Sequence, residues 1–391
     1  MPTPVILSGA RTPIGTLAGA LGELAAPKLG SVAIKGALAK SGVKPESVNE
    51  VFMGNVLTGG VGQAPARQAA IFAGIPDSVP ASTINKVCGS GMKAVITGTQ
   101  TILLGDNNIV VAGGMESMTN APYILPKARS GYRMGNGVLV DSMIHDGLWD
   151  PYGNVHMGNC GELCARELNF TREAQDEFAI RSFKLANEAM DNGYFADDIV
   201  GVEVPKGKEM VMVTEDEGPR KVKYDKIPSL KPVFDKNGTI TAANASSIND
   251  GAAALVLSSE EYAKANGLTA TAKIIAYSSF AQAPEWFTTS PVNSIEMVLA
   301  KANMKIGDID LFEINEAFAV VPMAVEKNLG VPREKINVLG GAIALGHPIG
   351  ASGARIIINL LNALKRNNKR FGLASICIGG GEATSIIIER I

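Results

Sequence analysis

Apolar positions recur at helical spacing after two Ser-Gly pairs of the chain. After Ser90 and Gly91 the shared face comprises Met92, Val95, Ile96, Thr99, Ile102 and Leu103, and after Ser352 and Gly353 it comprises Ile356, Ile357, Leu360, Leu361 and Leu364. Residues three and four apart lie on one side of a helix, so each run predicts a helix that begins at its Ser-Gly pair. Each run is followed by a turn and an apolar strand that ends in glycines, at 109–114 and at 373–381. Continuous apolar strands are typical of a sheet covered on both faces, which predicts an α/β fold.

The two ends of the chain repeat one plan. Residues 40–55 and 301–315 each read as the end of a helix, a short turn and a strand, and each segment precedes one of the two helices. We therefore predict an internal duplication. The first half comprises residues 1–118 together with 244–270, and the second half comprises residues 271–391.

The segment from 119 to 243 has a different character. The alternation of strands and helices is lost there, and charge increases. One helix is predicted clearly, because Thr171 is a good N-cap, Ala174, Phe178, Leu185 and Ala189 share a face, and Gly193 closes it. We predict a loop domain inserted into the first half, lying over the core and holding a substrate. The alternative is a solvated surface region without a role in binding.

Composition limits the partners and the compartment. The chain has 391 residues, 46% of them hydrophobic and 19% charged, with a net charge of −2. This balance gives no reason to expect nucleic acid or a membrane surface as a partner. No apolar segment reaches the roughly 18 residues that span a bilayer, and the apolar run at 4–9 is too short for a signal peptide. Four cysteines are too few for a disulfide framework, which favours a reduced, cytoplasmic compartment.

Two of these cysteines stand in glycine-rich surroundings. Cys88 precedes the first helix in the segment NKVCGSG, and Cys377 ends a strand before three glycines. Glycine lets a ligand approach the backbone N–H groups closely. A helix start favours thiolate over thiol, so we expect a lowered pKa at Cys88 and a nucleophilic role. A packed, inert cysteine is the alternative.

Two further residues suit proton transfer and polarisation of a carbonyl group. His347 lies between Gly346 and Pro348, just before the second helix, and an imidazole there can take a thiol proton and return it. The duplication would let the two equivalent helix starts face one shared site. Cys377 and Asn315 each end a predicted strand, where ligands of α/β sheets bind. A core cysteine and a turn-forming asparagine are the alternatives.

A metal site is not favoured. Cys160 and Cys164 follow His156 at spacings of four, a pattern that zinc ligands also show. A fourth ligand is missing unless His145 folds back, and paired CxxC knuckles are absent. The glycines at 89–91 lack a full dinucleotide-binding fingerprint, and no Walker A sequence is present.

Four segments resemble the motif blocks of the thiolase family. They are VCGSGM at 87–92, NEAF at 315–318, GGAIALGHPIGASG at 340–353 and CIGGG at 377–381. The likeness extends over nearly the whole chain, and the triplet His156-Met157-Gly158 is similar to the acetyl-CoA C-acetyltransferase branch. The resemblance implies a five-layer αβαβα fold of two duplicated halves with an inserted loop domain, assembled as a homodimer or homotetramer.

The resemblance also implies roles for single residues. Cys88 would hold the acyl group as a thioester, and His347 would activate Cys88 and, with a water held by Asn315, bind the thioester oxygen. Cys377 would remove the α-proton of the second acetyl-CoA, and the N–H groups of Cys88 and Gly379 would form an oxyanion hole. Coenzyme A is implied as a cosubstrate, with no permanently bound cofactor and no metal. The residues implied to contact it are His156, Met157 and Ser246 along the pantetheine arm, Phe287, and Arg220, which with its neighbouring lysines would meet the nucleotide phosphates.

The function predicted is the reversible Claisen condensation of two acetyl-CoA into acetoacetyl-CoA and CoA. A degradative 3-ketoacyl-CoA thiolase of broader chain length and a non-catalytic acyl-CoA carrier are the alternatives. The segment WFTTSP at 286–291 departs from the family pattern and leaves the acyl length open.

Overall fold

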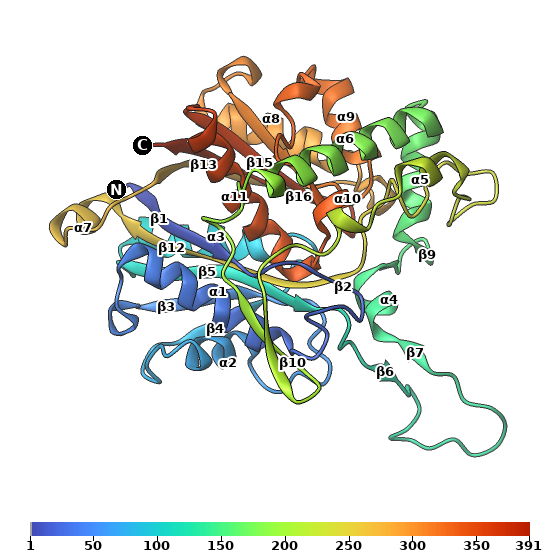
Figure 1. The fold of residues 1–391 in the computed structure, drawn as a ribbon, viewed down its shortest axis with the longest axis horizontal. Helices are drawn as coiled ribbons and strands as arrows, with labels where there is room; N and C mark the ends of the chain where they lie inside the picture. Colours follow the sequence, from blue (N-terminus) through green and yellow to red (C-terminus); the bar gives the residue numbers. More distant parts are fainter. Residues whose placement is uncertain (1) are drawn as a thin grey trace.

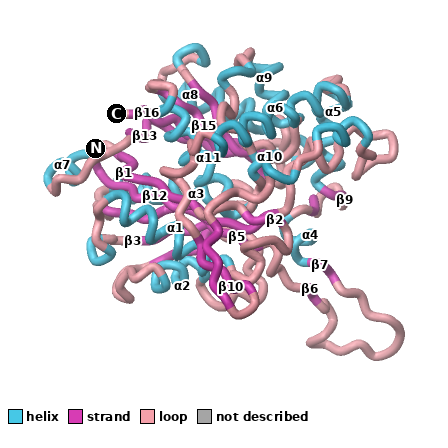
Figure 2. Tube along the Cα trace, viewed as in Figure 1, coloured by secondary structure: helices cyan, strands magenta, loops and turns pink. Residues whose placement is uncertain are grey.

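The structure, a computed structural model, describes residues 2–391 and is built around one large mixed sheet (Figures 1 and 2). The strands follow one another in the order β14 (Leu311–Ile314), β15 (Phe371–Ile378), β16 (Glu382–Arg390), β13 (Ala272–Ala281), β1 (Pro4–Arg11), β12 (Asn249–Ser259), β5 (Ile109–Ser117), β3 (Glu50–Gly54) and β4 (Ala81–Ile84). A short tenth strand, β2 (Gly15–Thr16), pairs with β12.

Strand pairing confirms the internal duplication. In the first half β3 runs parallel to β5, which is antiparallel to β12, which is antiparallel to β1. In the second half β14 runs parallel to β15, which is antiparallel to β16, which is antiparallel to β13. The halves join where Val5 and Ile6 of β1 pair with Lys273 and Ala272 of β13. One hydrogen-bonded sheet therefore runs through both halves.

Helices form the other layers of the five-layer fold. The helices α1 (Ala26–Ser41) and α2 (Pro65–Phe72) cover the outer face of the first half, and α8 (Ser290–Ala302) with α9 (Val320–Leu329) cover that of the second. Between them, α3 (Ser90–Leu104) packs against α11 (Ile349–Arg366). α3 contacts β3, β5 and β12 of the first half, and α11 contacts β5 and β12 as well as β14 and β15 of the second half. The helix predicted from Ser90 begins there. The second begins at Ile349 and not at Ser352, because the N–H groups of Ala351 and Ser352 already donate to the carbonyl of Pro348.

The inserted segment replaces a tight turn. Residues 118–248 connect β5 to β12, whereas the equivalent strands β15 and β16 are joined by residues 379–381 alone. The predicted helix is α6 (Arg172–Asp191), with Thr171 Oγ1 accepting from the N–H of Ala174 at 3.2 Å. Two further helices form in the insertion, α4 (Ser142–Gly147) and α5 (Met157–Glu167). The spacing of four between Cys160 and Cys164 predicts a helix there, and α5 confirms it, whereas α4 was not predicted. Its six residues are too few to show a strong period.

The insertion also contains paired strands. They are β6 (Tyr123–Ile124) with β7 (Val140–Asp141), β8 (Trp149–Asp150) with β9 (Val155–His156), and β10 (Val202–Lys206) with β11 (Glu209–Val213). Elsewhere, the short helices α7 (Glu260–Ala265) and α10 (Ala342–Leu345) precede β13 and α11 respectively.

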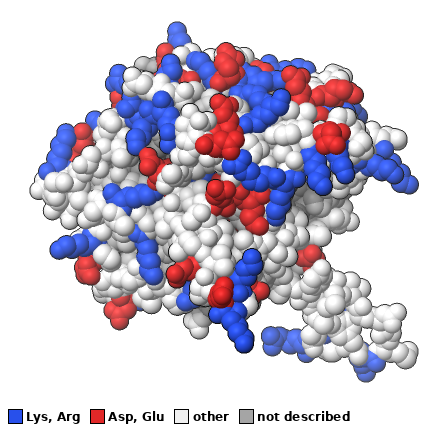
Figure 3. Space-filling view, in the orientation of Figure 1, with Lys and Arg blue, Asp and Glu red and all other residues white. Residues whose placement is uncertain are grey.

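The connection from β6 to β7 projects from the body of the molecule (Figures 1 and 2). In Figure 3 the rest of this face carries charges of both signs, whereas the projecting part is mostly uncharged with a few basic side chains. No helix of residues 2–391 has both the length and the apolar character needed to cross a membrane.

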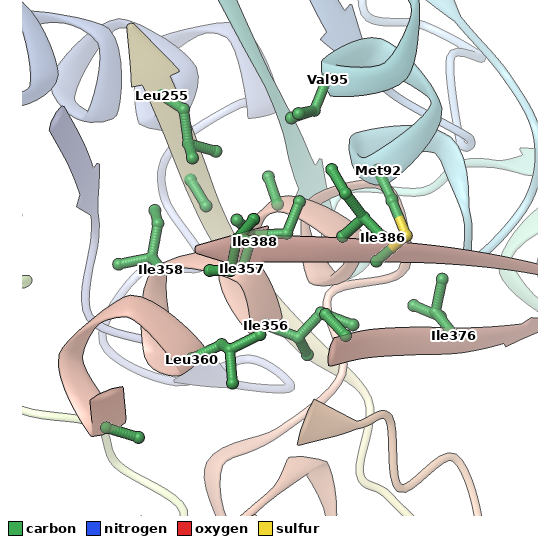
Figure 4. Packing of buried hydrophobic residues seen from close by; sticks show 14 of the residues in the cluster. Met92, Val95, Leu255, Ile356, Ile357, Ile358, Leu360, Ile376, Ile386 and Ile388 are labelled. Carbon is green, nitrogen blue, oxygen red and sulfur yellow. The ribbon is translucent and has the colours of Figure 1, made fainter. Parts of the chain in front are cut away.

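The core lies between the central helices and the sheet. Figure 4 shows isoleucines of α11 and of β15 and β16 meeting Met92 and Val95 of α3 and Leu255 of β12. The predicted apolar faces of the two central helices are therefore largely buried, with only Leu103 and Leu361 partly exposed. This packing fixes both helix starts, and the candidate site forms there.

Candidate active site

The starts of α3 and α11 cross at glycines. A Cβ on Gly91 would lie 2.9 Å from the N of Ala354, and a Cβ on Gly353 would lie 2.3 Å from the N of Met92. Real Cβ atoms do not come this close to backbone, so glycine is needed at both positions. This contact brings the residues just before each helix, Cys88 and His347, to one place.

The loop that carries Cys88 is tightly held. Val87 has a φ of 44°, an unusual conformation for a β-branched residue and a sign of a constrained turn. The Ser90 hydroxyl donates to the carbonyl of Val87 at 2.6 Å and accepts from the N–H of Lys86 at 2.8 Å. A Cβ on Gly89 would lie 2.3 Å from Cδ1 of Ile378. The thiol of Cys88 is therefore presented from a rigid turn against the end of β15.

The turn after Cys377 faces the Cys88 loop. Gly380 and Gly381 have φ values of 90° and 83°, which favour glycine, and the carbonyl of Gly381 accepts from Ser290 Oγ at 2.7 Å. Lys86 of the Cys88 loop forms an ion pair with Glu382 just beyond the turn. The ion pair joins the two glycine-rich loops, and the bond from Ser290 anchors the second loop to α8.

His347 is buried and hydrogen-bonded at both ring nitrogens. Nδ1 lies 2.6 Å from Oγ of Ser352, and Nε2 lies 3.5 Å from Nδ2 of Asn315. Its backbone N–H donates to Oδ1 of Asn249 at 2.9 Å. The preceding Gly346 has a φ of 109°, and a Cβ there would lie 2.5 Å from the Asn249 side chain. The position of the imidazole is therefore set by three separate segments.

Burial keeps the reactive groups neutral. It raises the pKa of Cys88 to about 11, although the N–H groups of Gly379 and of Cys88 itself act in the opposite direction. Burial, and next the positive charge of Arg355, lower the pKa of His347 to about 3. Burial also raises the pKa of Cys377 well above its ordinary value, and a charge on Cys88 would raise it further. The expectation of a lowered pKa at Cys88 is therefore wrong, because desolvation outweighs the helix start.

A cavity of about 390 Å³ opens onto Cys88. Its lining includes His347, Gly379 and four of the five residues expected to contact CoA, namely His156, Met157, Ser246 and Phe287. Cys377 and Asn315 do not line it. Cys377 is buried two residues before Gly379, and Asn315 is buried against His347. The structure thus brings four distant segments of the chain to one site.

Four aromatic rings shape the cavity, of which Phe234 and Phe318 were not among the predicted site residues. His156 stacks on Phe234 with ring centroids 4.7 Å apart, and Phe318 meets Phe234 and Phe287 edge-on at 6.1 and 6.3 Å. The sequence could have indicated Phe318 as a site residue, because it belongs to the NEAF motif. Nothing in the sequence indicated Phe234, since it lies in an irregular part of the insertion.

Arg220 is not part of this cavity. Its guanidinium is paired with Asp191 at 2.8 Å and donates to Oδ1 of Asn187 at 3.2 Å, so α6 holds it away. The neighbouring Lys221, Lys223 and Lys226 line a second cavity of about 360 Å³. The two cavities share Ala242 and Ser247 in their walls, so they adjoin.

The other cysteines are buried and unpaired. Cys160 and Cys164 lie within α5, all four cysteines are free, and His156 is the N-cap of the helix, accepting from the N–H of Gly158 at 3.0 Å. Within residues 2–391 no three His, Cys, Asp or Glu side chains gather as metal ligands would. The zinc pattern of the sequence therefore has no counterpart in this structure.

Comparison with known proteins agrees with the fold and the motifs. Residues 4–261 match the thiolase N-terminal domain, and residues 268–390 match the thiolase C-terminal domain. The chain belongs to the thiolase family. It is 51% identical to the acetyl-CoA acetyltransferase of Schizosaccharomyces pombe over 99% of this chain and 98% of that protein. It is equally identical to the acetyl-CoA acetyltransferase of Cupriavidus necator over 99% of both chains. The crystal structure of the Bacillus anthracis acetyl-CoA acetyltransferase superposes with a TM-score of 0.98 at 41% identity, covering 100% of this chain and 99% of that one.

Proposed function

We propose that the protein is an acetyl-CoA acetyltransferase that reversibly condenses two acetyl-CoA into acetoacetyl-CoA and CoA. Full-length relatives with this name support the reaction class. The observation that carries the proposal is the single cavity that presents Cys88, His347 and Gly379 together, with Cys377 buried beside it. A non-catalytic carrier would not need this set of groups.

In the first half-reaction Cys88 attacks the thioester carbonyl of acetyl-CoA. A thiol with a pKa of about 11 is protonated at neutral pH, so its proton must move to Nε2 of His347 as the S–C bond forms. The N–H groups of Cys88 and Gly379 stabilise the carbonyl oxygen as charge develops. The C–S bond to CoA then breaks, and the CoA thiolate takes the Cys377 proton and leaves as free CoA.

In the second half-reaction the Cys377 thiolate removes a proton from the methyl carbon of a second acetyl-CoA. A thiol of raised pKa is a strong base once ionised, which suits a weak carbon acid. His347 and a water held by Asn315 bind the enolate oxygen, and the enolate carbon attacks acetyl-Cys88. Cys88 leaves as a thiolate and recovers its proton from His347, so all groups return to their resting state.

The two adjoining cavities suit the two ends of coenzyme A. The apolar cavity with His156, Met157, Ser246 and Phe287 would take the pantetheine arm, which must reach Cys88. The cavity with Lys221, Lys223 and Lys226 would take the nucleotide phosphates, since lysine ammonium groups attract phosphate. Coenzyme A is then a substrate and product, and no permanently bound cofactor is needed.

The projecting loop supports assembly into a homodimer or homotetramer. Its exposed apolar side chains include Tyr123, Met134, Val138 and Leu139, with Met134 99% exposed. Solvent-exposed apolar side chains in such a group are typical of contact surfaces. For the compartment we propose the cytoplasm, on the strength of four unpaired cysteines. Relatives carry both cytosolic and mitochondrial names.

The test is thiolysis of acetoacetyl-CoA by the purified protein, together with intact-mass analysis after exposure to acetyl-CoA. We expect one acetyl group on the wild-type chain and none on a Cys88→Ala variant, and turnover reduced by about 10³-fold or more in Cys88→Ala and by about 10²–10⁴-fold in Cys377→Ala. Four-carbon and ten-carbon 3-ketoacyl-CoA substrates should differ strongly in rate, in favour of the shorter. Binding of CoA without an acetyl adduct would instead identify a carrier.

A further inference from the structure

Arg355 is a fully buried arginine with little to stabilise it. It lies on the core-facing side of α11 and is 2% exposed. Its closest carboxylate, Oε2 of Glu313, lies 3.9 Å from Nη1, and within residues 2–391 neither Nε nor Nη1 has a hydrogen-bond partner. Burying a guanidinium costs several kcal/mol unless close pairing repays it. Stability alone does not explain an arginine at this position.

The hydrogen bond that this guanidinium does make among residues 2–391 reaches the active site. Nη2 of Arg355 donates to Oδ1 of Asn315 at 3.2 Å. A guanidinium only donates, so the amide oxygen must face Arg355 and the amide nitrogen must face His347. The Asn315 amide is therefore held in one of its two possible orientations.

This orientation decides which nitrogen of His347 carries the proton. Nδ2 of Asn315 is a donor 3.5 Å from Nε2, so Nε2 must present a lone pair. On the other side of the ring, the Ser352 hydroxyl donates to the carbonyl of Pro348 at 2.9 Å, and it accepts from Nδ1–H at 2.6 Å. Both contacts select the same neutral tautomer, with the proton on Nδ1. Nε2 is then free to receive the proton of Cys88.

We propose that Arg355 is a positioning residue for acyl transfer, which holds the Asn315 amide so that Nε2 of His347 stays unprotonated beside Cys88. The proposal rests on the proposed function, in which Nε2 is the base. The positive charge of Arg355 acts in the same direction, because it disfavours a second positive charge on the imidazole. The other ionisable groups on the elements around His347 are Cys88 before α3, Glu116 on β5, Asp250 on β12, Glu313 on β14, Glu316 after β14 and Cys377 on β15.

The test compares the wild-type protein with a double variant, Arg355→Met with Glu313→Gln, which avoids an unpaired buried carboxylate. We expect kcat for acetoacetyl-CoA thiolysis to fall about tenfold to hundredfold with little change in KM, as for a misplaced reacting group. The acid limb of the kcat–pH profile should move to higher pH, because loss of the Arg355 charge raises the pKa of His347, although burial still holds it below its ordinary value, and the imidazolium cannot accept a proton. In an Asn315→Ala background the same double substitution should have little further effect on kcat.

A second readout does not depend on activity. With only three histidines in the chain, ¹⁵N-histidine labelling allows His347 to be followed by NMR. The wild-type ring should show the Nδ1–H tautomer, whereas the double variant, in which the Asn315 amide is free to turn, should show a mixture of the Nδ1–H and Nε2–H tautomers. A wild-type ring in the Nε2–H tautomer would overturn the proposal, even if the variant failed to fold. If the tautomer is as expected but no thiolysis occurs, the proposed function fails and the positioning contact stands.

The matched control is the other fully buried arginine of the chain. Arg11 is bonded to Asp216 at 2.7 and 2.8 Å, so Arg11→Met with Asp216→Asn removes a comparable pair. This control should lower stability but leave the His347 tautomer and the pH profile unchanged. A folded Arg355→Met, Glu313→Gln variant with an unchanged His347 tautomer and an unchanged kcat–pH profile would refute a positioning role.

Discussion

Replacing Gly353 by alanine would test the crossing of the two central helices. Alanine is the better helix former by up to about 1 kcal/mol, so local propensity alone predicts a more stable protein. The structure predicts the opposite. The new Cβ would lie 2.3 Å from the N of Met92 and 3.1 Å from its Cα, whereas ordinary contacts begin at 3.4 Å.

The size of the effect follows from what must move. The atoms struck belong to the backbone of α3, so a rotamer change cannot relieve the contact, and the helices must separate by about 1 Å. Overpacking of this kind typically costs 1–3 kcal/mol, which exceeds the gain in helix propensity. The same separation moves Cys88 away from His347, and a displacement of about 1 Å at reacting groups can cost 10²-fold in rate.

Urea denaturation would measure the loss of stability, and acetoacetyl-CoA thiolysis would measure the loss of turnover. Gly307→Ala is the control, since no heavy atom lies within 4 Å of a Cβ there and φ is not positive. It should stay within about 0.5 kcal/mol of wild type. A Gly353→Ala protein with unchanged midpoint and unchanged turnover would show that α3 and α11 do not meet in this way.

Three further predictions address the site itself. Ser352→Ala removes the acceptor for Nδ1–H of His347. Because a buried unpaired donor costs about 1–3 kcal/mol, the urea midpoint should fall, and kcat should fall roughly 5- to 100-fold as the Nδ1–H tautomer loses its partner; an unchanged kcat would contradict the assigned tautomer. Alkylation of Cys88 by iodoacetamide should accelerate as pH rises toward about 11, since the thiol ionises only there, and a plateau reached near pH 7 would show a stabilised thiolate instead. Phe287→Ala should enlarge the apolar cavity and raise the rate with a ten-carbon substrate relative to a four-carbon one, so an unaltered ratio would place the limit on acyl length elsewhere.

The periodicity of apolar residues predicted a helix and its buried face correctly where that face meets a uniformly apolar surface. The helix starting at Ser90 was predicted correctly because its apolar spacing continues into the core. On α6 it predicted the helix and the buried positions Phe178 and Ala189, but not the whole buried face. Leu185 of the predicted face is only partly buried, while Gln175, Asp176 and Ser182 are buried. These polar side chains bond to Thr239, Asn244 and Glu316 on other segments. Such partners are distant in the chain and leave no periodic signal.

The sequence by itself indicated the α/β class and the duplication, and it singled out Cys88, His347 and Cys377 as candidate reactive residues. The spacing of apolar residues, the glycine-rich loops and the order of the motifs are properties of short segments, so they can be recognised without the folded structure. Only the tertiary structure decided the charge states, because desolvation depends on everything packed around a group: it keeps Cys88 a thiol and His347 neutral. It also excluded Arg220 from the cavity and brought Arg355 to Asn315 across the core. An arginine within an apolar helix gives no hint in the sequence of which distant amide it will hold.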